Sequence, residues 1–310
     1  MISHAWITRH ERIFRQLSGF QLRSDRVLHS PGSILAPAHP PRKTTGMTKI
    51  ATVSYLNALP LIAGLENERD ITLSRRVPSE LLATLEDQDA DLALCPVIDF
   101  QTSSTALEIV PSGAIGCNGA ALTVKLFSRL PISQLQRIVV DGESHTSVAL
   151  LQIVLHEMFQ QRPALVAATH SPENADAEAL LLIGDKVIHS TPDPSVYPHQ
   201  LDLGDAWKKI SGTPFVFATW MTRSGIDLGG VPDLLSSIRN DNRARLPELA
   251  AKNAAANGWP EDLAVTYLSR KLRYELDQPE LAGIEEFWRR CHELGIIDEL
   301  RPMRLYGRKS

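Results

Sequence analysis

The sequence is poor in cysteine and has no long apolar run, and each shortage excludes a class of protein. Its three cysteines (Cys95, Cys117 and Cys291) lie far apart and form no CxxC pair. A small, uneven number of cysteines argues against a disulfide framework and against a structural zinc site. No stretch approaches the ~18 consecutive apolar residues that a membrane span needs. The net charge of −4 offers no clustered basic excess for a nucleic-acid surface.

Motifs of several common enzyme classes are missing as well. The sequence contains no HExxH, GxSxG, P-loop or GxGxxG pattern, and these are typical of metal, serine-triad, phosphate-loop and dinucleotide sites. We therefore expect neither a metal nor an organic cofactor. The first residues also lack the apolar segment of a secretory leader. A cytoplasmic location is expected for this reason.

The first 46 residues differ in composition from the rest of the chain. They contain seven basic residues against only Glu11 and Asp25, and they end in a proline-rich run over residues 31–43. Residues 1–46 are expected to be a disordered extension, or the product of a start codon assigned too early. The folded part is then expected to begin at Met47, where a strand pattern starts directly.

From residue 49 onward, strand and helix patterns alternate. Residues 49–55, 71–77 and 91–97 are β-branched or apolar and predict strands, while 59–65 and 78–87 predict the helices between them. This β-α-β-α-β order implies a parallel sheet. Further strands are predicted at 120–128, 136–142, 164–169, 179–188 and 212–221, and further helices at 146–159, 231–244, 260–276 and 279–295.

The alternation defines an α/β protein but leaves its layout open. At 310 residues and 43% hydrophobic, the chain can form one doubly wound domain or two lobes. In the two-lobed layout the chain crosses near residues 117–123 and 213–220. The lobes are then 47–119 plus 221–310, and 120–220. A ligand is expected in the cleft between them, outside the carboxyl ends of the strands.

Two polar clusters follow predicted strands. Ser54, Tyr55 and Asn57 lie where the first strand ends, and Asn57 either stabilises the turn or points its amide into the cleft. A neutral amide can orient a hydroxyl but cannot carry a proton at neutral pH. The second cluster, residues 144–147, opens a long helix, where free backbone N–H groups attract anions. One hydroxyl suffices as a cap, so three of them (Ser144, Thr146 and Ser147) favour a carboxylate or phosphate site, whereas His145 is more typical of a cap.

Two further segments have small or acidic residues beside a strand. The glycine-rich stretch 113–119, which ends at Gly119, is interpreted as a loose connection between lobes, and Thr123 beyond it is placed to reach the cleft. Gly184 and Asp185 end a buried strand. The carboxylate of Asp185 either caps a neighbouring helix or contacts a hydroxyl of the ligand.

The opening segment VSYLNALPL (53–61) resembles the opening motif of chorismate dehydratases. The sister enzymes, the 1,4-dihydroxy-6-naphthoate synthases, open with a Ser-Pro-Cys-Pro-Asn-Asp motif that is absent here. Thr123 stands where the family has serine, so a hydroxyl is retained, and the N-terminal extension is not a family feature. The resemblance covers roughly residues 48–295, and its other segments follow in the family's order at 77–100, 113–131, 141–155, 181–188 and 202–220.

This resemblance implies a two-lobed fold like that of type II periplasmic binding proteins. It also implies a cofactor-free lyase that converts chorismate to 3-[(1-carboxyvinyl)oxy]benzoate in the futalosine pathway of menaquinone biosynthesis. The implied partner is chorismate, and the protein is expected to be a monomer or homodimer. The implied catalytic residue is Asn57, and the implied substrate contacts are Ser54, Tyr55, Gly119, Thr123, Ser144, Thr146, Ser147 and Asp185.

The proton acceptor has no evident candidate among Asp, Glu or His, so the enolpyruvyl carboxylate of the substrate is one hypothesis. Three other functions stay open at this point. A solute-binding protein would share the scaffold but normally carries a secretory signal. A naphthoate synthase would act on a cyclic futalosine derivative. A LysR-type regulator would carry a helix-turn-helix pattern before residue 47, and none is present.

Overall fold

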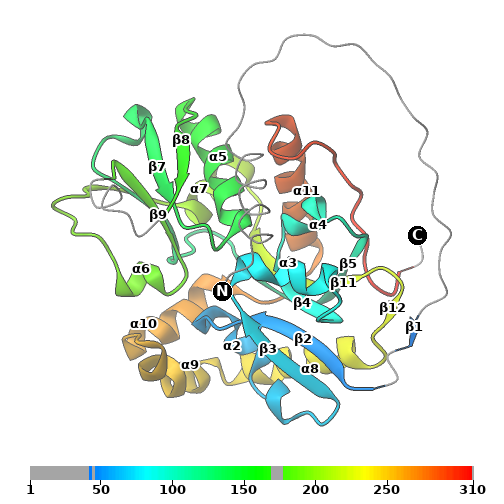
Figure 1. The fold of residues 1–310 in the computed structure, drawn as a ribbon. Coiled ribbons are helices and arrows are strands. Elements are labelled where there is room, and N and C mark those ends of the chain that lie inside the picture. Colours follow the sequence, from blue (N-terminus) through cyan, green and yellow to red (C-terminus); the bar gives the residue numbers. More distant parts are fainter. Residues whose placement is uncertain (1–41, 44–45, 169–176, 309–310) are drawn as a thin grey trace, which may run out of the picture.

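Two mixed β-sheets with flanking helices organise the protein (Figure 1). The structure is a computed structural model and describes residues 42–43, 46–168 and 177–308. One sheet has six strands in the order β13-β5-β11-β4-β2-β3, and the other has five in the order β10-β6-β9-β7-β8. The α/β class expected from the sequence is confirmed.

The six-stranded sheet contains the predicted parallel unit. Strand β2 pairs in parallel with both β3 and β4, as the β-α-β-α-β order implied. Strand β11 then runs antiparallel between β4 and β5, and the short β13 pairs with the end of β5. The bounds are β2 (Thr48–Val53), β3 (Ile71–Arg76), β4 (Leu92–Pro96), β5 (Leu107–Cys117), β11 (Phe215–Arg223) and β13 (Leu272–Arg273).

The five-stranded sheet is built from the middle of the chain. Strand β7 pairs in parallel with β8 and β9, while β6 runs antiparallel to β9 and β10. The chain enters this sheet after β5 and returns from it to β11, so both crossings lie near the predicted positions. The exact lobe boundaries stay a prediction. The bounds are β6 (Val124–Ser128), β7 (Arg137–Val140), β8 (Ala164–Ala167), β9 (Ala179–Ile183) and β10 (His199–Asp202).

The helices begin and end at residues suited to those positions. Ser144 caps α5 by accepting a hydrogen bond from Ser147 N, and Asp202 caps α7 in the same way. Gly212, at a φ of 72°, ends α7. The bounds are α2 (Leu59–Ile62), α3 (Pro78–Glu86), α4 (Asp99–Thr102), α5 (His145–Phe159), α6 (Lys186–His189), α7 (Leu203–Ser211), α8 (Val231–Ala244), α9 (Leu246–Ala254), α10 (Glu261–Thr266) and α11 (Gln278–Glu293).

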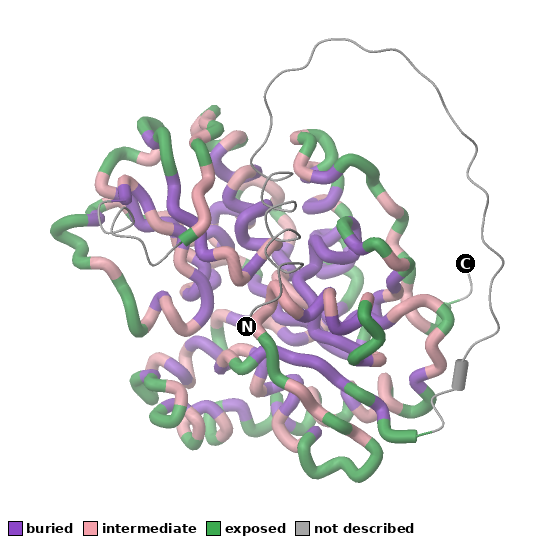
Figure 2. The backbone as a smooth tube through the Cα atoms, viewed as in Figure 1, coloured by how far each residue is buried: buried purple, intermediate pink, exposed green. Residues whose placement is uncertain are grey.

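The buried residues follow the strands and the inner faces of the helices (Figure 2). The largest fully buried side chains include three tryptophans: Trp207, Trp220 and Trp288. A continuous apolar cluster connects both sheets, and its burial supplies the main driving force for folding. Within the described residues, no helix has the length and apolar composition that crossing a membrane requires.

The glycine-rich stretch is not the loose connection that was expected, because most of it belongs to β5. Gly113 and Gly116 are needed there for close packing. A Cβ at Gly113 would lie 2.7 Å from a methyl group of Leu61, and one at Gly116 would lie 2.6 Å from the carbonyl oxygen of Phe215. Without side chains, the strand can approach α2 and β11. The predicted strand at 120–128 is correspondingly shorter and begins at Val124.

Two other predicted elements end early. The helix predicted over 260–276 stops at Thr266, continues as a π-helical turn, η6 (Tyr267–Lys271), and becomes β13. The strand predicted over 179–188 ends at Ile183 because Gly184 has a φ of 58°, and α6 follows. Of the N-terminal extension, Arg42–Lys43 form β1, which pairs with β12 (Ile226–Asp227). The prediction of disorder over 1–46 falls mostly outside the described residues.

Candidate active site

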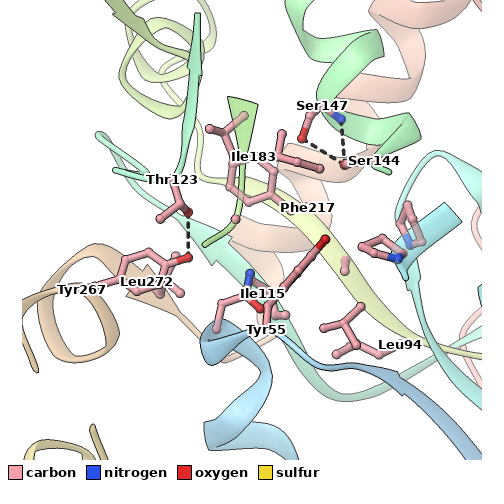
Figure 3. Close-up of a pocket in the computed structure, with 17 residues that line it drawn as sticks. Tyr55, Leu94, Ile115, Thr123, Ser144, Ser147, Ile183, Phe217, Tyr267 and Leu272 are labelled. Atoms are coloured by element: carbon pink, nitrogen blue, oxygen red, sulfur yellow. Dashed lines mark hydrogen bonds between the residues drawn. The ribbon is translucent and has the colours of Figure 1, made fainter. Parts of the chain in front are cut away.

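A pocket of about 590 Å³, its open mouth included, lies between the two sheets (Figure 3). Its walls come from β2, β4, β5, β11 and β13 on one side and from β6, β9 and the start of α5 on the other. Most lining side chains are apolar. Among the described residues that line it there is no Asp, Glu, Lys, Arg or His. Its polar groups are Tyr55, Asn57, Thr123, Ser144, Ser147 and Tyr267.

Asn57 lies in η1 (Leu56–Ala58), the short 3-10 turn that follows β2, and its side chain lines the pocket. Its Oδ1 atom is buried and has no hydrogen-bond partner among the described residues. An unsatisfied buried acceptor costs about 1–3 kcal/mol. Such a group calls for a partner that the described part of the chain does not provide. The turn at η1 has no side-chain cap, so the capping interpretation of Asn57 finds no support there.

Tyr55 belongs to a small network of charged residues beside the pocket. Its hydroxyl donates to Glu143, and Lys186 Nζ lies 2.8 Å from both Glu143 Oε1 and Asp141 Oδ2. Burial, reinforced by Glu143, raises the pKa of Tyr55 well above its ordinary value. The hydroxyl therefore stays protonated. For Lys186, burial lowers the pKa, but the two carboxylates outweigh it and raise the pKa overall.

The start of α5 presents hydroxyl groups to the pocket. Ser144 Oγ donates to Ser147 Oγ at 3.0 Å. Figure 3 draws this hydrogen bond, and both residues line the pocket. Thr146, expected to join them, is turned away: its Oγ1 accepts a hydrogen bond from Ile98 N at 3.2 Å, and the residue is fully buried. The N-terminus of a 15-residue helix thus faces the pocket with two hydroxyls, an arrangement that suits a carboxylate.

A buried ion pair lies next to this helix start. His145 Nδ1 is 2.8 Å from Asp99 Oδ1, and the side chain of Asp99 is fully buried. Burial raises the pKa of Asp99, and His145 opposes this in part. Burial lowers the pKa of His145, but the Asp99 carboxylate outweighs it and raises the pKa overall. Neither residue lines the pocket, so their effect on it is through the position of α5.

Thr123 meets a residue that the sequence patterns did not indicate. Its Oγ1 lies 2.7 Å from the hydroxyl of Tyr267, and both side chains are buried and line the pocket. Tyr267 stacks on Trp259 at a centroid distance of 4.8 Å. Trp259 in turn donates its indole N–H to Asp185 Oδ1 at 3.0 Å. Periodicity placed Tyr267 inside a regular helix, and no sequence signal marks the π-helical turn that presents it.

Three more of the expected substrate contacts lie outside the pocket lining. Ser54 is exposed, and Gly119, at a φ of 119°, lies in the crossing between the sheets. The carboxylate of Asp185 accepts hydrogen bonds from the indole N–H of Trp259 and, at 3.4 Å, from Leu56 N. The structure therefore brings Tyr55, Asn57, Thr123, Ser144 and Ser147 together in one pocket and leaves Ser54, Gly119, Thr146 and Asp185 outside its lining.

Several solved structures share the fold. Protein AF1704 from Archaeoglobus fulgidus aligns with a TM-score of 0.64 at 12% identity, over 82% of this chain and 100% of that one. The periplasmic aliphatic sulphonate binding protein SsuA from Escherichia coli aligns with a TM-score of 0.56 at 13% identity, over 86% and 96%. At such low identity the likeness concerns the fold alone. The expected fold of the periplasmic-binding-protein type is confirmed.

Sequence comparison agrees with the resemblance found above. A chorismate dehydratase from Thermus thermophilus is 28% identical over 249 residues, which cover 75% of this chain and 91% of that protein. The profile of a family described by its role in menaquinone biosynthesis matches residues 48–293. Because this match spans most of the 310 residues, the protein belongs to the menaquinone biosynthesis family.

Proposed function

We propose that the protein is a chorismate dehydratase, which removes water from chorismate to give 3-[(1-carboxyvinyl)oxy]benzoate in the futalosine pathway. Family membership supports the general role, and the similarity to a chorismate dehydratase supports the substrate. The observation that carries the proposal is the pocket itself. As far as the described residues show, it combines a buried amide oxygen at Asn57 that has no hydrogen-bond partner with walls that bear no charged side chain.

The pocket suits a small dicarboxylate for two reasons. Its lining is mostly apolar with a few polar groups, which is typical of small-molecule sites. At one end, the start of α5 with Ser144 and Ser147 offers hydroxyls and a helix N-terminus to a carboxylate. A carboxylate held there needs no arginine, because backbone N–H groups and the helix dipole favour negative charge.

The reaction requires removal of a ring hydroxyl and of the hydrogen on the neighbouring carbon, which lie on the same face of the ring. Asn57 Oδ1 accepts a hydrogen bond from the departing hydroxyl and orients it. The lining, as formed by residues 46–168 and 177–308, includes no Asp, Glu or His that could take the proton. The substrate's enolpyruvyl carboxylate accepts it and passes it to the leaving hydroxyl, so that water departs. The C–H electron pair becomes the new ring double bond.

Aromatisation of the ring supplies the driving force, so the protein's contribution is positioning and exclusion of water. Buried side chains surround the reacting atoms: Thr123 and Tyr267 are 3% and 1% exposed. Tyr55 and Tyr267 both have pKa values raised by burial. They remain neutral hydrogen-bond donors and do not act as bases near neutral pH.

The proposal is tested by incubating the purified protein with chorismate and following the product by chromatography. An Asn57→Ala variant is expected to lose about 100-fold or more in kcat, as happens when a positioning group is removed. The matched control is Asn67→Ala, because Asn67 is an exposed asparagine outside the pocket. Equal turnover in the Asn57→Ala and control variants would remove Asn57 from the mechanism.

The fold likeness to a sulphonate-binding protein makes a binding protein the second candidate. Isothermal titration with chorismate separates the two functions, because tight binding without product would support a binding protein. Activity on a cyclic futalosine derivative, with none on chorismate, would instead indicate the sister naphthoate synthase.

A further inference from the structure

Tyr267 is the least exposed of the polar side chains that line the pocket, at 1%. Its position is fixed by three independent features. Its ring stacks on Trp259 at an interplanar angle of 13°. Its backbone begins the five-residue π-helical turn η6, a distortion that is frequent at functional sites. Its hydroxyl lies 2.7 Å from Thr123 Oγ1 (Figure 3).

The hydroxyl of Tyr267 stays protonated in this environment, because burial raises its pKa well above the ordinary value. Thr123 Oγ1 is the partner that lies within hydrogen-bond distance of it. Asn57 lines the same pocket, and its Oδ1 atom is buried without a partner among the described residues.

Either oxygen of the Tyr267–Thr123 pair can donate the hydrogen bond. The phenol is a stronger acid than an aliphatic alcohol, and with the phenol as donor Thr123 has its own proton left to donate toward the pocket. Removing the phenol hydroxyl would free the threonine hydroxyl to rotate.

We propose that Tyr267 is a positioning residue, which donates to Thr123 and so fixes the Thr123 hydroxyl as a donor toward the substrate. This role rests on the proposed function. Asn57 holds the departing hydroxyl through its hydrogen, while Thr123 donates to the oxygen as the carbon–oxygen bond breaks. A neutral donor of fixed orientation thus assists the leaving hydroxyl in place of a charged acid.

The support of Tyr267 extends through two further residues. Trp259 is 4% exposed, and its indole N–H is held by the carboxylate of Asp185. Asp185 also accepts a hydrogen bond from Leu56 N, beside Asn57 in the chain. The ring of Tyr267 is therefore held by packing alone, and loss of its hydroxyl leaves that packing in place. This property makes phenylalanine a clean replacement.

The test compares Tyr267→Phe with Tyr274→Phe in chorismate turnover. Tyr274 is a matched control, since it is also buried, lies outside the pocket lining and has a hydroxyl without a partner among the described residues. Tyr267→Phe is expected to lower kcat roughly 10- to 100-fold, because the reacting groups lose their fixed geometry. KM and Tm are expected to stay near the wild-type values. Unchanged kcat in Tyr267→Phe, or an equal loss in Tyr274→Phe, would overturn the role.

A double-mutant cycle with Thr123→Val provides the second readout. If Tyr267 acts through Thr123, the double variant is expected to be little slower than the slower single variant. Losses that multiply independently would show that the two hydroxyls act separately, and the inference would be wrong. A wild-type protein that leaves chorismate unchanged would overturn the proposed function, and with it the role of Tyr267. Normal wild-type turnover with a fully active Tyr267→Phe would overturn the positioning role alone.

Discussion

Replacing Asp185 decides between two roles for its carboxylate. The family resemblance made Asp185 a substrate contact, whereas the structure joins it to Trp259 Nε1 at 3.0 Å and to Leu56 N at 3.4 Å. In the second role Asp185 connects the end of β9 to the two segments that carry Asn57 and Tyr267. We therefore expect Asp185→Ala to affect stability and the geometry of the pocket, but not the affinity of the substrate directly.

The size of the effect follows from the two hydrogen bonds. A bond to a charged acceptor contributes about 1.5–3 kcal/mol, and the shorter one, to Trp259, has ordinary geometry. The bond to Leu56 N is at the limit of a hydrogen bond and adds little. Burial raises the pKa of Asp185, which shows that desolvating the carboxylate offsets part of the gain. A net loss of about 1.5 kcal/mol lowers Tm by roughly 2–3 °C in a protein of 310 residues, at an unfolding entropy of about 2.1 cal/mol/K per residue.

Differential scanning fluorimetry and chorismate kinetics on Asp185→Ala, with Asp89→Ala as the control, measure both quantities. Asp89 is an exposed carboxylate outside the pocket lining. We expect a lower Tm and a lower kcat in Asp185→Ala, with KM unchanged. A carboxylate that accepted a hydrogen bond from a substrate hydroxyl would instead raise KM when removed. An unchanged Tm together with a higher KM would refute the connecting role.

Three further predictions follow from packing and charge. Gly204→Ala is expected to lose about 1–3 kcal/mol of unfolding free energy from overpacking, since its Cβ would lie 2.6 Å from both Cys117 Sγ and Gly119 O. The control Gly230→Ala places its Cβ in open space and is expected to leave the unfolding free energy, measured by urea denaturation, unchanged. Equal losses in the two variants would contradict the overpacking. Lys186→Met leaves the carboxylates of Asp141 and Glu143 without their shared partner and is expected to raise KM for chorismate roughly 3- to 10-fold at low salt. Lys209→Met, whose ion pair with Asp205 is exposed, is expected to leave KM unchanged, and a similar KM in both variants would rule out the charge effect. The folded pKa of His145 is raised by Asp99, so this pair contributes stability below the unfolded pKa of about 6.5 and loses it as pH rises through the folded value. The Tm difference between wild type and Asp99→Asn is therefore expected to be larger at pH 6 than at pH 9, and a difference independent of pH would contradict the pairing.

The elements predicted correctly are those whose local signals agree with their surroundings. The helix over 231–244 coincides with α8, because a proline in the first turn and an amphipathic pattern both depend only on nearby residues. The parallel unit of β2, β3 and β4 follows from the strict alternation of strands and helices. The pocket location of Asn57 and Thr123 follows from their places beside strand ends, although their roles remain proposals.

The features that were misjudged in β5 and around the pocket depend on distant contacts. Glycine is required at positions 113 and 116 of β5, because α2 and β11 come too close for a side chain there. A local sequence pattern does not reveal these neighbouring elements. Tyr267 leaves the helical path to meet Thr123, which is far away in the sequence. Thr146 is turned from the pocket because its hydroxyl serves as the acceptor for Ile98 N. In each case a tertiary contact overrides a local preference.

The chain leaves the six-stranded sheet at the end of β5, at Cys117, and re-enters it at the start of β11, at Phe215. These two residues are paired in the sheet. The whole five-stranded unit, residues 118–214, is therefore an insertion between the two arms of one hairpin. A short turn could join these arms and leave the larger sheet connected. If a domain from another protein replaced residues 118–214, the pocket wall formed by Thr123, Ser144 and Ser147 would be replaced. Asn57 and Tyr267 would stay in place. The chain thus offers a modular route to new substrates, in which six of the 17 described residues that line the pocket are interchangeable.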